Sequence, residues 1–331
     1  MVHKFNGSYE EIISLDNLLL AWHEFAKGKR SRVDVQAYEF QLMDNLIALH
    51  ESLAMMKYLH GPYTAFTITD PKVRKIHKAT VADRIVHRAL HRRIYPYFDK
   101  RFITDSYSCR IGKGTHRALN RFKQLVRKES CNHRKTCWVL KCDIRKFFAS
   151  VDHKILLNIL RGVIADERVF WLCERIISSF SSDMPDVGIP LGNLTSQLFA
   201  NVYMNKFDQL IKHELHIRHY IRYADDFVVI SRDRNYLEKV LIRIDEFLTH
   251  ELWLQLHPNK VEIKSIAQGV DFLGWVHFPY HRVLRTATKR RMMRRLQENP
   301  SLCTLASCNG LLKHGNTYNL LYFIDFYTHL C

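Results

Sequence analysis

The feature that most constrains this chain is a pair of adjacent carboxylates, Asp225 and Asp226, set between two strand-forming runs. Residues 219–222 before the pair and 227–230 after it are rich in β-branched and aromatic side chains. Such runs around a short polar step predict a β-hairpin with a tight turn. Turns favour Asp, but two in a row in an apolar hairpin indicate a use for paired negative charge. Paired carboxylates of this kind hold two Mg²⁺ ions in enzymes that transfer nucleotidyl groups.

The charge balance bears on the partner of such a site. The 331 residues include 50 Lys and Arg against 33 Asp and Glu, a net charge of +17 with His neutral. A field of this size favours polyanionic partners, although solubility alone is the alternative explanation. The chain also holds 15 Tyr, 19 Phe and 5 Trp. Because bases stack on rings while cations neutralise phosphates, we expect a nucleic-acid partner.

The cysteines and the apolar segments indicate the compartment. None of the eight cysteines forms a CxxC pair, which argues against a zinc ribbon. Cys131, His133 and Cys137 have a spacing that a metal knuckle could use, but reduced cytosolic thiols are the favoured interpretation. The sequence shows neither the apolar run of a signal peptide nor the ~18 apolar residues of a membrane span. We therefore expect a soluble, cytoplasmic protein without a membrane partner.

Residue periodicity predicts mixed helices and strands without the regular order of a βαβ array, and hence the α+β class. Apolar residues at helical spacing predict two N-terminal helices, one capped at Ser14 and ending near Gly28, the other broken at Gly61. Alternation predicts a strand pair over 63–77. The other expected helices cover 82–98, a segment from about 116, a segment from His153 capped by Asp152, 165–182, a segment through 198–207, 235–250, 289–300 and 320–330, and a strand-turn-strand region covers 254–284.

A third acidic residue, Asp143, ends an expected strand over 138–143, about eighty residues before the hairpin. Two-metal phosphoryl transfer needs carboxylates from separate elements that converge on one point. Taken alone, Asp143 is better explained as a turn or helix-capping residue. Together with Asp225 and Asp226 it predicts a two-metal site, because a strand end and a hairpin supply the required geometry.

Several segments between residues 60 and 300 carry motifs in a fixed order. Residues 72–76 and 83–86 come first, then Asp143-Ile144-Arg145-Lys146-Phe147-Phe148, residues 188–197, Tyr223-Ala224-Asp225-Asp226 and Phe272-Leu273-Gly274-Trp275. In this order they resemble the fingers, first palm, middle, catalytic-hairpin and primer-grip motifs of reverse transcriptases. The resemblance implies a right-hand polymerase with fingers, an antiparallel palm sheet, a short helical thumb and a short helical N-terminal extension. The expected boundaries are 1–60 for the extension, 61–135 for the fingers, 136–155 and 186–279 for the palm, 156–185 for a helical insertion and 280–331 for the thumb.

The middle motif narrows the resemblance. Most reverse transcriptases carry Gln-Gly-x-x-x-Ser-Pro there, whereas this chain has Leu191-Gly192 followed by Ser196-Gln197. In the reverse transcriptases of diversity-generating retroelements, an aliphatic residue typically replaces the first Gln of this motif, and Gln replaces its Pro. The short length without an attached maturase, endonuclease or RNase H segment is also similar to that group. The alternatives are another bacterial reverse transcriptase, of retron, group II-like or abortive-infection type, and a non-catalytic RNA-binding scaffold, against which the intact aspartates argue.

The resemblance implies roles for the catalytic residues. Asp143 and Asp225, with the backbone carbonyl of Ile144, are expected to ligate two Mg²⁺ ions, for which Mn²⁺ can substitute. Asp226 is expected to complete the negative charge of this metal site. Lys260 resembles the lysine that donates a proton to departing pyrophosphate, with a plain surface lysine as the alternative.

The resemblance also implies binding residues. Arg74 is expected to bind the incoming triphosphate, with a solvated charge as the alternative. Phe148 is expected to exclude a 2′-hydroxyl, with core packing as the alternative. The other residues expected to contact the dNTP are Lys146 and Phe147, through their backbone N–H groups, and Leu191 and Gly192. Leu191 and Gln197 are expected to affect fidelity. Primer and template are expected to contact Gly274, Trp275, Arg290, Arg291 and Arg294, of which the arginines form a basic thumb helix, with a solvated helix face as the alternative.

The expectation about copying fidelity depends on Leu191. In faithful relatives the Gln at this place forms a hydrogen bond near the nascent base pair, and losing such a contact forfeits about 1 kcal/mol of discrimination, roughly five- to tenfold. The resemblance therefore implies error-prone cDNA synthesis, chiefly opposite template adenine, for mutagenic retrohoming. The implied partners are a template-repeat RNA, the RNA/cDNA duplex, dNTPs and a helical, oligomeric accessory variability protein in the cytoplasm of a bacterial, archaeal or phage-infected cell.

Overall fold

The computed structural model describes residues 4–70 and 72–328, so Cys331 and the outermost ends of the expected N-terminal extension and thumb lie outside the described residues. The chain forms two compact units, each assembled from stretches that are distant in sequence. Unit 1 comprises Met1–Thr104, Ile144–Glu214 and Glu246–Gln255, and unit 2 comprises Asp105–Asp143, Leu215–Asp245 and Leu256–Cys331. Helices and antiparallel strands occur in both units, which confirms the α+β class.

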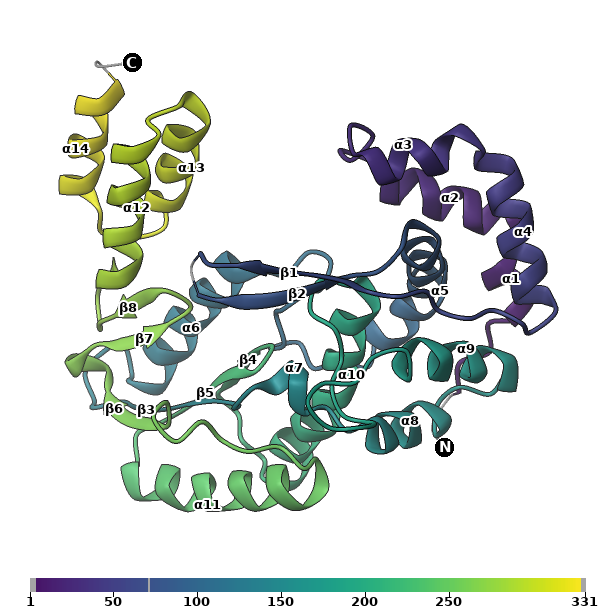
Figure 1. The fold of residues 1–331 in the computed structure, drawn as a ribbon. Helices are drawn as coiled ribbons and strands as arrows, with labels where there is room; N and C mark the ends of the chain where they lie inside the picture. The colour runs from purple at the N-terminus through teal and green to yellow at the C-terminus, as the bar shows by residue number, and fades with distance from the viewer. Residues whose placement is uncertain (1–3, 71, 329–331) are drawn as a thin grey trace. The chain divides into compact units, whose positions relative to one another are not determined.

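Unit 1 opens with helices, as predicted (purple in Figure 1). The Ser14 hydroxyl accepts a hydrogen bond from the Asn17 backbone N–H and caps α2, which confirms the predicted helix start. Buried Leu18 and Trp22 of α2 face α5, the helix predicted over 82–98. The bounds are α1 (Tyr9–Ile13), α2 (Leu15–Ala26), α3 (Val33–Phe40), α4 (Leu42–Ala54) and α5 (Val81–Asp99), of which α1 and α3 had not been predicted.

A two-stranded antiparallel hairpin follows α4 in unit 1 and confirms the predicted strand pair. It consists of β1 (Thr64–Ile68) and β2 (Arg74–Lys78), with Ile68 opposite Arg74. Most of its residues are exposed or only partly buried. The hairpin therefore offers its side chains to solvent or to a ligand more than to a core.

The rest of unit 1 is helical. Asp152 accepts a hydrogen bond from the Ile155 backbone N–H at 2.8 Å and caps α8, as predicted. The helices are α7 (Phe147–Ser150), α8 (His153–Arg161), α9 (Glu167–Ile177) and α10 (Leu194–Gln209), the last continued by a π-helical turn, η1 (Leu210–Glu214). Apart from its ends α10 is mostly buried, which explains its lack of an amphipathic pattern. Among the described residues, no helix is both long enough and apolar enough to cross a membrane.

Unit 2 is built on a four-stranded antiparallel sheet in the order β4-β5-β3-β6. Its strands are β3 (Trp138–Asp143), β4 (Tyr220–Tyr223), β5 (Asp226–Ser231) and β6 (Glu262–Ser265). The amphipathic helix α6 (Thr115–Glu129) packs against β4 and β5 through Leu119 and Phe122. Helix α11 (Arg234–Glu251) follows β5, near the span predicted for it, and its residues from Glu246 on belong to unit 1.

The C-terminal part of unit 2 holds a smaller sheet and three helices. A 3-10 turn, η2 (Ile266–Gln268), leads into β7 (Val270–Phe272), β8 (Trp275–His277) and β9 (Arg282–Leu284), which pair antiparallel in that order. The helices are α12 (Thr286–Glu298), α13 (Leu302–Leu312) and α14 (Tyr318–Thr328), of which α13 had not been predicted. One apolar cluster joins α6, both sheets and these helices, for example through Phe122, Trp275 and Leu312.

Unit 1 encloses a polar network around two histidines. The Nε2 atoms of His60 and His87 lie 3.1 Å apart, and Nδ1 of His87 lies 3.3 Å from Oγ1 of Thr195 in α10. The hydroxyl of Tyr58 donates to the neighbouring Asp83 at 2.7 Å. Burial, assisted by the neighbouring His60, lowers the pKa of His87 to about 3. His87 is therefore neutral at physiological pH and links α5 to α10 without carrying charge.

We predict that this network makes the chain less stable in mild acid. The pKa of His87 falls from 6.5 in the unfolded chain to about 3 in the folded chain. Between these values the unfolded chain binds a proton that the folded chain does not, so stability present above pH 6.5 is lost as the pH falls. His87→Gln removes this titration, and the loss in unfolding free energy between pH 7.5 and pH 5 should shrink by roughly 2 kcal/mol. Equal losses in both proteins, measured by denaturant titration at each pH, would contradict the prediction.

Candidate active site

Three carboxylates of unit 2 lie where β3, β4 and β5 meet. Asp143, the last residue of β3, is the register partner of Asp226, the first residue of β5. Directly opposed residues point to the same face of a sheet, with Cβ atoms about 4.5–5.5 Å apart. Asp225 lies in the two-residue turn before Asp226, whose other partner is Tyr223 of β4. The sheet therefore brings the predicted aspartates together, but Asp226 belongs to the strand and only Asp225 lies in the turn.

The turn is held by an arginine that the sequence reasoning missed. Ala224 has a φ of 56°, a left-handed conformation that is unfavourable for a residue with a Cβ atom. The side chain of Arg222 is fully buried, and its Nη1 donates to the carbonyl oxygen of Ala224 at 3.1 Å. The backbone of Arg222 also bonds to Asp105 and Tyr107. A charged residue inside the otherwise apolar run 220–223 was the available signal for this role.

Asp226 lies in an electrostatic environment that is unfavourable for its negative charge. The residue is partly buried, but its Oδ1 atom is fully enclosed and has no hydrogen-bond partner. Burial raises the pKa of Asp226 to about 7; the nearby Lys141 opposes this rise, and the charges of Asp143 and Asp225 add to it. A cation would stabilise such an unpartnered carboxylate oxygen beside two further carboxylates, so the chemistry of these side chains suits a divalent metal ion.

Lys260 lies next to Asp143. Its Nζ atom is 2.7 Å from Oδ1 of Asp143. The backbone N–H of His257 donates to the carbonyl oxygen of Asp143, and the N–H of Lys260 donates to the carbonyl of His257. The loop before β6 is thus attached to the end of β3 and fixes the lysine there. Its role as a proton donor remains a prediction.

The metal ligands also remain a prediction. Within residues 4–70 and 72–328, no group of three or more His, Cys, Asp or Glu side chains is arranged to hold a metal ion. Lys260 instead provides the positive charge at Asp143. The described residues also show no metal knuckle at Cys131, His133 and Cys137, and the seven described cysteines are free thiols.

The residues predicted to bind dNTP belong to unit 1. In α7, Phe147 is buried, whereas Phe148 is partly exposed. The carbonyl of Phe148 accepts a hydrogen bond from the backbone of Ile189 at 2.8 Å. Arg74 is exposed at the first position of β2, and Lys146 is exposed immediately before α7 with a φ of 45°. The structure therefore leaves Arg74, Lys146 and Phe148 accessible.

The middle motif is attached to the hairpin of unit 1. The backbone N–H of His77 in β2 donates to the carbonyl of Leu191 at 3.0 Å. Gly192 has a φ of +108°, and a Cβ atom there would lie 2.8 Å from a methyl group of Ile76. Only glycine fits this position without displacement. The side chain of Leu191 is partly buried, and Gln197 is exposed on α10.

The residues predicted to bind primer and template lie in the C-terminal part of unit 2. Leu273 and Gly274, with φ values of 51° and 84°, form the two-residue turn between β7 and β8. Trp275 is buried in the core, so it can support a primer only through this hairpin. On α12, Arg290 and Arg294 are exposed one turn apart. The third predicted residue of this helix, Arg291, is partly buried.

Comparison with known proteins gives the family. The family model described as "Reverse transcriptase (RNA-dependent DNA polymerase)" matches residues 69–277, well over half of the chain. The chain therefore belongs to the reverse transcriptase family and is an enzyme, an RNA-directed DNA polymerase. Members of this family use divalent metal ions, an RNA template and dNTPs.

Relatives of several kinds share this similarity. Protein YkfC of Escherichia coli (strain K12) is 26% identical over 297 residues, which cover 78% of this chain and 74% of that protein. The group II intron-encoded protein LtrA of Lactococcus lactis subsp. cremoris is 20% identical, over 62% of this chain and 44% of its own length. The chain thus spans less than half of the intron-encoded relative.

A solved structure shows the same fold. The structure of apo telomerase from Candida tropicalis, truncated from its C-terminal domain, matches with a TM-score of 0.51 at 11% identity. The match covers 73% of this chain and 60% of that chain. This likeness concerns the fold alone and confirms the predicted right-hand polymerase class.

The contact between Lys260 and Asp143 generates a prediction about proton transfer. Lys260→Gln should slow single-nucleotide addition by about 10²-fold, because general acid catalysis contributes on that order. Lys260→Arg keeps the positive charge beside Asp143, but it should remain slow because a guanidinium releases its proton poorly. Lys264→Gln, which removes a lysine paired with Glu262 on the adjoining β6, is the matched control and should retain the normal rate. Full recovery in the Arg variant, measured by rapid-quench extension, would show that the ion pair alone matters.

Proposed function

We propose that this chain is the reverse transcriptase of a diversity-generating retroelement. In this proposal it copies a template-repeat RNA into cDNA with frequent errors opposite adenine, and the cDNA serves mutagenic retrohoming. The observation that carries the proposal is Leu191, which stands where most reverse transcriptases have Gln, together with Gln197 in place of Pro.

The surroundings of Leu191 support a direct effect on base-pair discrimination. His77 of β2 donates its N–H to the carbonyl of Leu191 and accepts a hydrogen bond from the Asn193 side chain at 3.0 Å. These bonds hold the backbone on both sides of Gly192. A change of the side chain at 191 therefore alters the chemistry at this position without moving the chain. An aliphatic side chain offers no hydrogen bond to the nascent pair, so mismatches at adenine are penalised less.

The catalytic assignment follows from the carboxylates of unit 2. Asp143 and Asp225, with the carbonyl of Ile144, would hold two Mg²⁺ ions or Mn²⁺ in their place, and Asp226 adds negative charge. When bound, such ions activate the primer hydroxyl and neutralise charge on the triphosphate. Lys260 holds a proton for the departing pyrophosphate.

The substrate assignment follows from unit 1. The guanidinium of Arg74 suits the triphosphate oxygens, and the backbone N–H groups of Lys146 and Phe147 are proposed to add to this binding. The ring of Phe148 selects dNTP by leaving no room for a 2′-hydroxyl. The partial exposure of Phe148, in contrast to the buried Phe147, supports this choice.

Charge and exposed apolar residues support the proposed macromolecular partners. The net charge of +17 suits the template-repeat RNA and the RNA/cDNA duplex. Phe40, Met43 and Ile47 are exposed large apolar residues on α3 and α4. Large exposed apolar side chains this close in sequence support a protein contact, which we assign to the accessory variability protein. The second candidate function, a group II-like reverse transcriptase, is supported by the similarity to LtrA.

The first test is primer extension by the purified chain on an RNA template, with and without the accessory protein and the cognate RNA. We predict that Asp143→Asn and Asp225→Asn each reduce extension by at least about 10³-fold, because metal-dependent charge stabilisation is lost. Asp233→Asn, in an exposed loop beyond β5, is the matched control and should retain activity. Retained activity in either catalytic variant would contradict the two-metal assignment.

The second test addresses fidelity. We predict that Leu191→Gln lowers misincorporation opposite template adenine by about five- to tenfold, because it restores a polar contact. Leu194→Gln, the same change at the first residue of α10, is the matched control. Sequencing of the cDNA measures both error spectra. Unchanged errors at adenine in Leu191→Gln would reject the proposed origin of infidelity, while the polymerase activity itself would still stand.

A further inference from the structure

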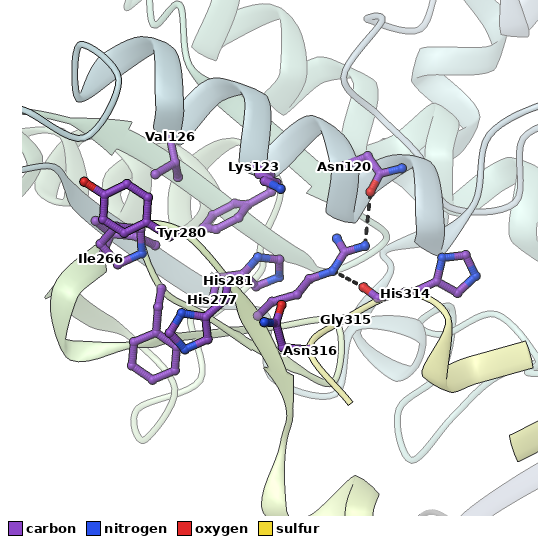
Figure 2. A pocket seen from close by; sticks show the side chains of 14 residues that line it. Asn120, Lys123, Val126, Ile266, His277, Tyr280, His281, His314, Gly315 and Asn316 are labelled. Atoms are coloured by element: carbon purple, nitrogen blue, oxygen red, sulfur yellow. Dashed lines mark hydrogen bonds between the residues drawn. The ribbon is translucent and has the colours of Figure 1, made fainter. Parts of the chain in front are cut away.

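A cavity of about 240 Å³ lies in unit 2 between α6 and the hairpin that joins β8 to β9. Figure 2 shows the 14 residues that line it. They include Lys123, Arg282 and three histidines, and no Asp or Glu is among the described residues that line it. None of Asp143, Asp225, Asp226 and Lys260 contributes to it. The cavity is thus a basic site separate from the catalytic carboxylates.

Arg282 in this cavity has an unsatisfied donor. Its Nη2 donates to Oδ1 of Asn120 at 3.1 Å, and its Nε donates to the carbonyl of His314 (dashed in Figure 2). Its Nη1 is buried and has no hydrogen-bond acceptor. A guanidinium stays protonated in proteins, so its free N–H can be satisfied only by an added acceptor. An oxyanion is the acceptor that also balances the charge.

His277 adds a second unpartnered polar atom. The residue is only 3% exposed, its Nε2 has no hydrogen-bond partner, and its ring lies edge-on to Phe122 with centroids 4.6 Å apart. Burial, followed by the charge of Arg282, lowers the pKa of His277 to about 3. The ring is therefore neutral and offers one hydrogen bond without further charge. A buried polar atom without a partner is rare and indicates a ligand that completes it.

The rim of the cavity carries an aromatic ring and a free-standing cation. Tyr280 is 75% exposed, and His133 holds it edge-on at a centroid distance of 4.9 Å. Lys123 is exposed on α6, the same helix that exposes Arg117 and Lys128. Rings bind bases by stacking and lysines bind phosphates, so this combination suits a nucleotide better than a bare anion.

We propose that this cavity is a second RNA-binding site, which takes one nucleotide of a single-stranded RNA segment. Arg282 and Lys123 bind its phosphate, His277 bonds to it more deeply, and the base lies against Tyr280. This proposal requires an RNA partner, and reverse transcriptases use an RNA template. It does not depend on the proposal that this chain copies RNA with frequent errors. It would anchor the RNA outside the polymerase centre, so that a long RNA stays bound while its template segment moves.

The test is photo-cross-linking of the full chain to a single-stranded RNA that contains 4-thiouridine, followed by peptide mapping. We expect a cross-linked peptide that contains Tyr280. Lys123→Glu should reduce this cross-link about tenfold, and Arg282→Lys should also reduce it, since the planar fork is lost. Lys128→Glu is the matched control, because it makes the same charge change on the same helix outside the cavity, and it should change the yield less than about twofold. Extension of a short primer-template should be unaffected in Lys123→Glu.

Three outcomes would overturn the proposal. The first is an absence of cross-links at the β8–β9 hairpin. The second is an equal reduction by Lys123→Glu and Lys128→Glu, which would indicate only a general basic field. The third is protection of Tyr280 from cross-linking by millimolar inorganic phosphate but not by unlabelled RNA, which would assign the cavity to a free anion. Failure of the proposed function would instead appear as a lack of primer extension in the unmodified chain.

Discussion

The antiparallel register of β3 and β5 is the constraint on which the rest of the site depends. It places Asp143 directly opposite Asp226, although like charges so placed repel each other. The register is fixed elsewhere in the pair, because buried Val139 and Leu140 lie opposite buried Ile230 and Val229. A slip of one residue would break these apolar pairs and move the partly buried Lys141 to the opposite face of the sheet. Apolar packing therefore forces two carboxylates together.

The cations near this pair are distributed unevenly. Lys260 neutralises Asp143, whereas Arg222 donates a hydrogen bond to the carbonyl of Ala224 and so supports the turn. Asp226 keeps an enclosed oxygen without a donor, and its raised pKa reports the resulting cost. The sheet thus holds a strained turn and an unsatisfied carboxylate at one edge. Such local strain persists only where the surrounding structure fixes it, and it concentrates at functional sites.

Much of this site could be predicted from the sequence because its motifs are local. The hairpin at 220–231, the strand that ends at Asp143 and the caps at Ser14 and Asp152 each depend on neighbouring residues. The features that escaped prediction depend on contacts distant in sequence. Arg222 forms backbone hydrogen bonds with the loop at 105–107, and Arg282 donates a hydrogen bond to Asn120, which is 162 residues away in the sequence. Helix α13 was not predicted because its apolar and small residues do not recur at helical spacing along one face.

The division of the chain into units separates the carboxylates from the residues proposed to select the substrate. The unit boundary falls between Asp143 and Ile144, so the carboxylates belong to unit 2, whereas Phe148 and Leu191 belong to unit 1. The apolar cluster beneath the carboxylate-bearing sheet draws its described residues from unit 2. Leu191 is not among the described residues of this cluster, which include Val139 and Val228. In the proposed function, a substitution at 191 therefore acts on base-pair discrimination and leaves this cluster unchanged.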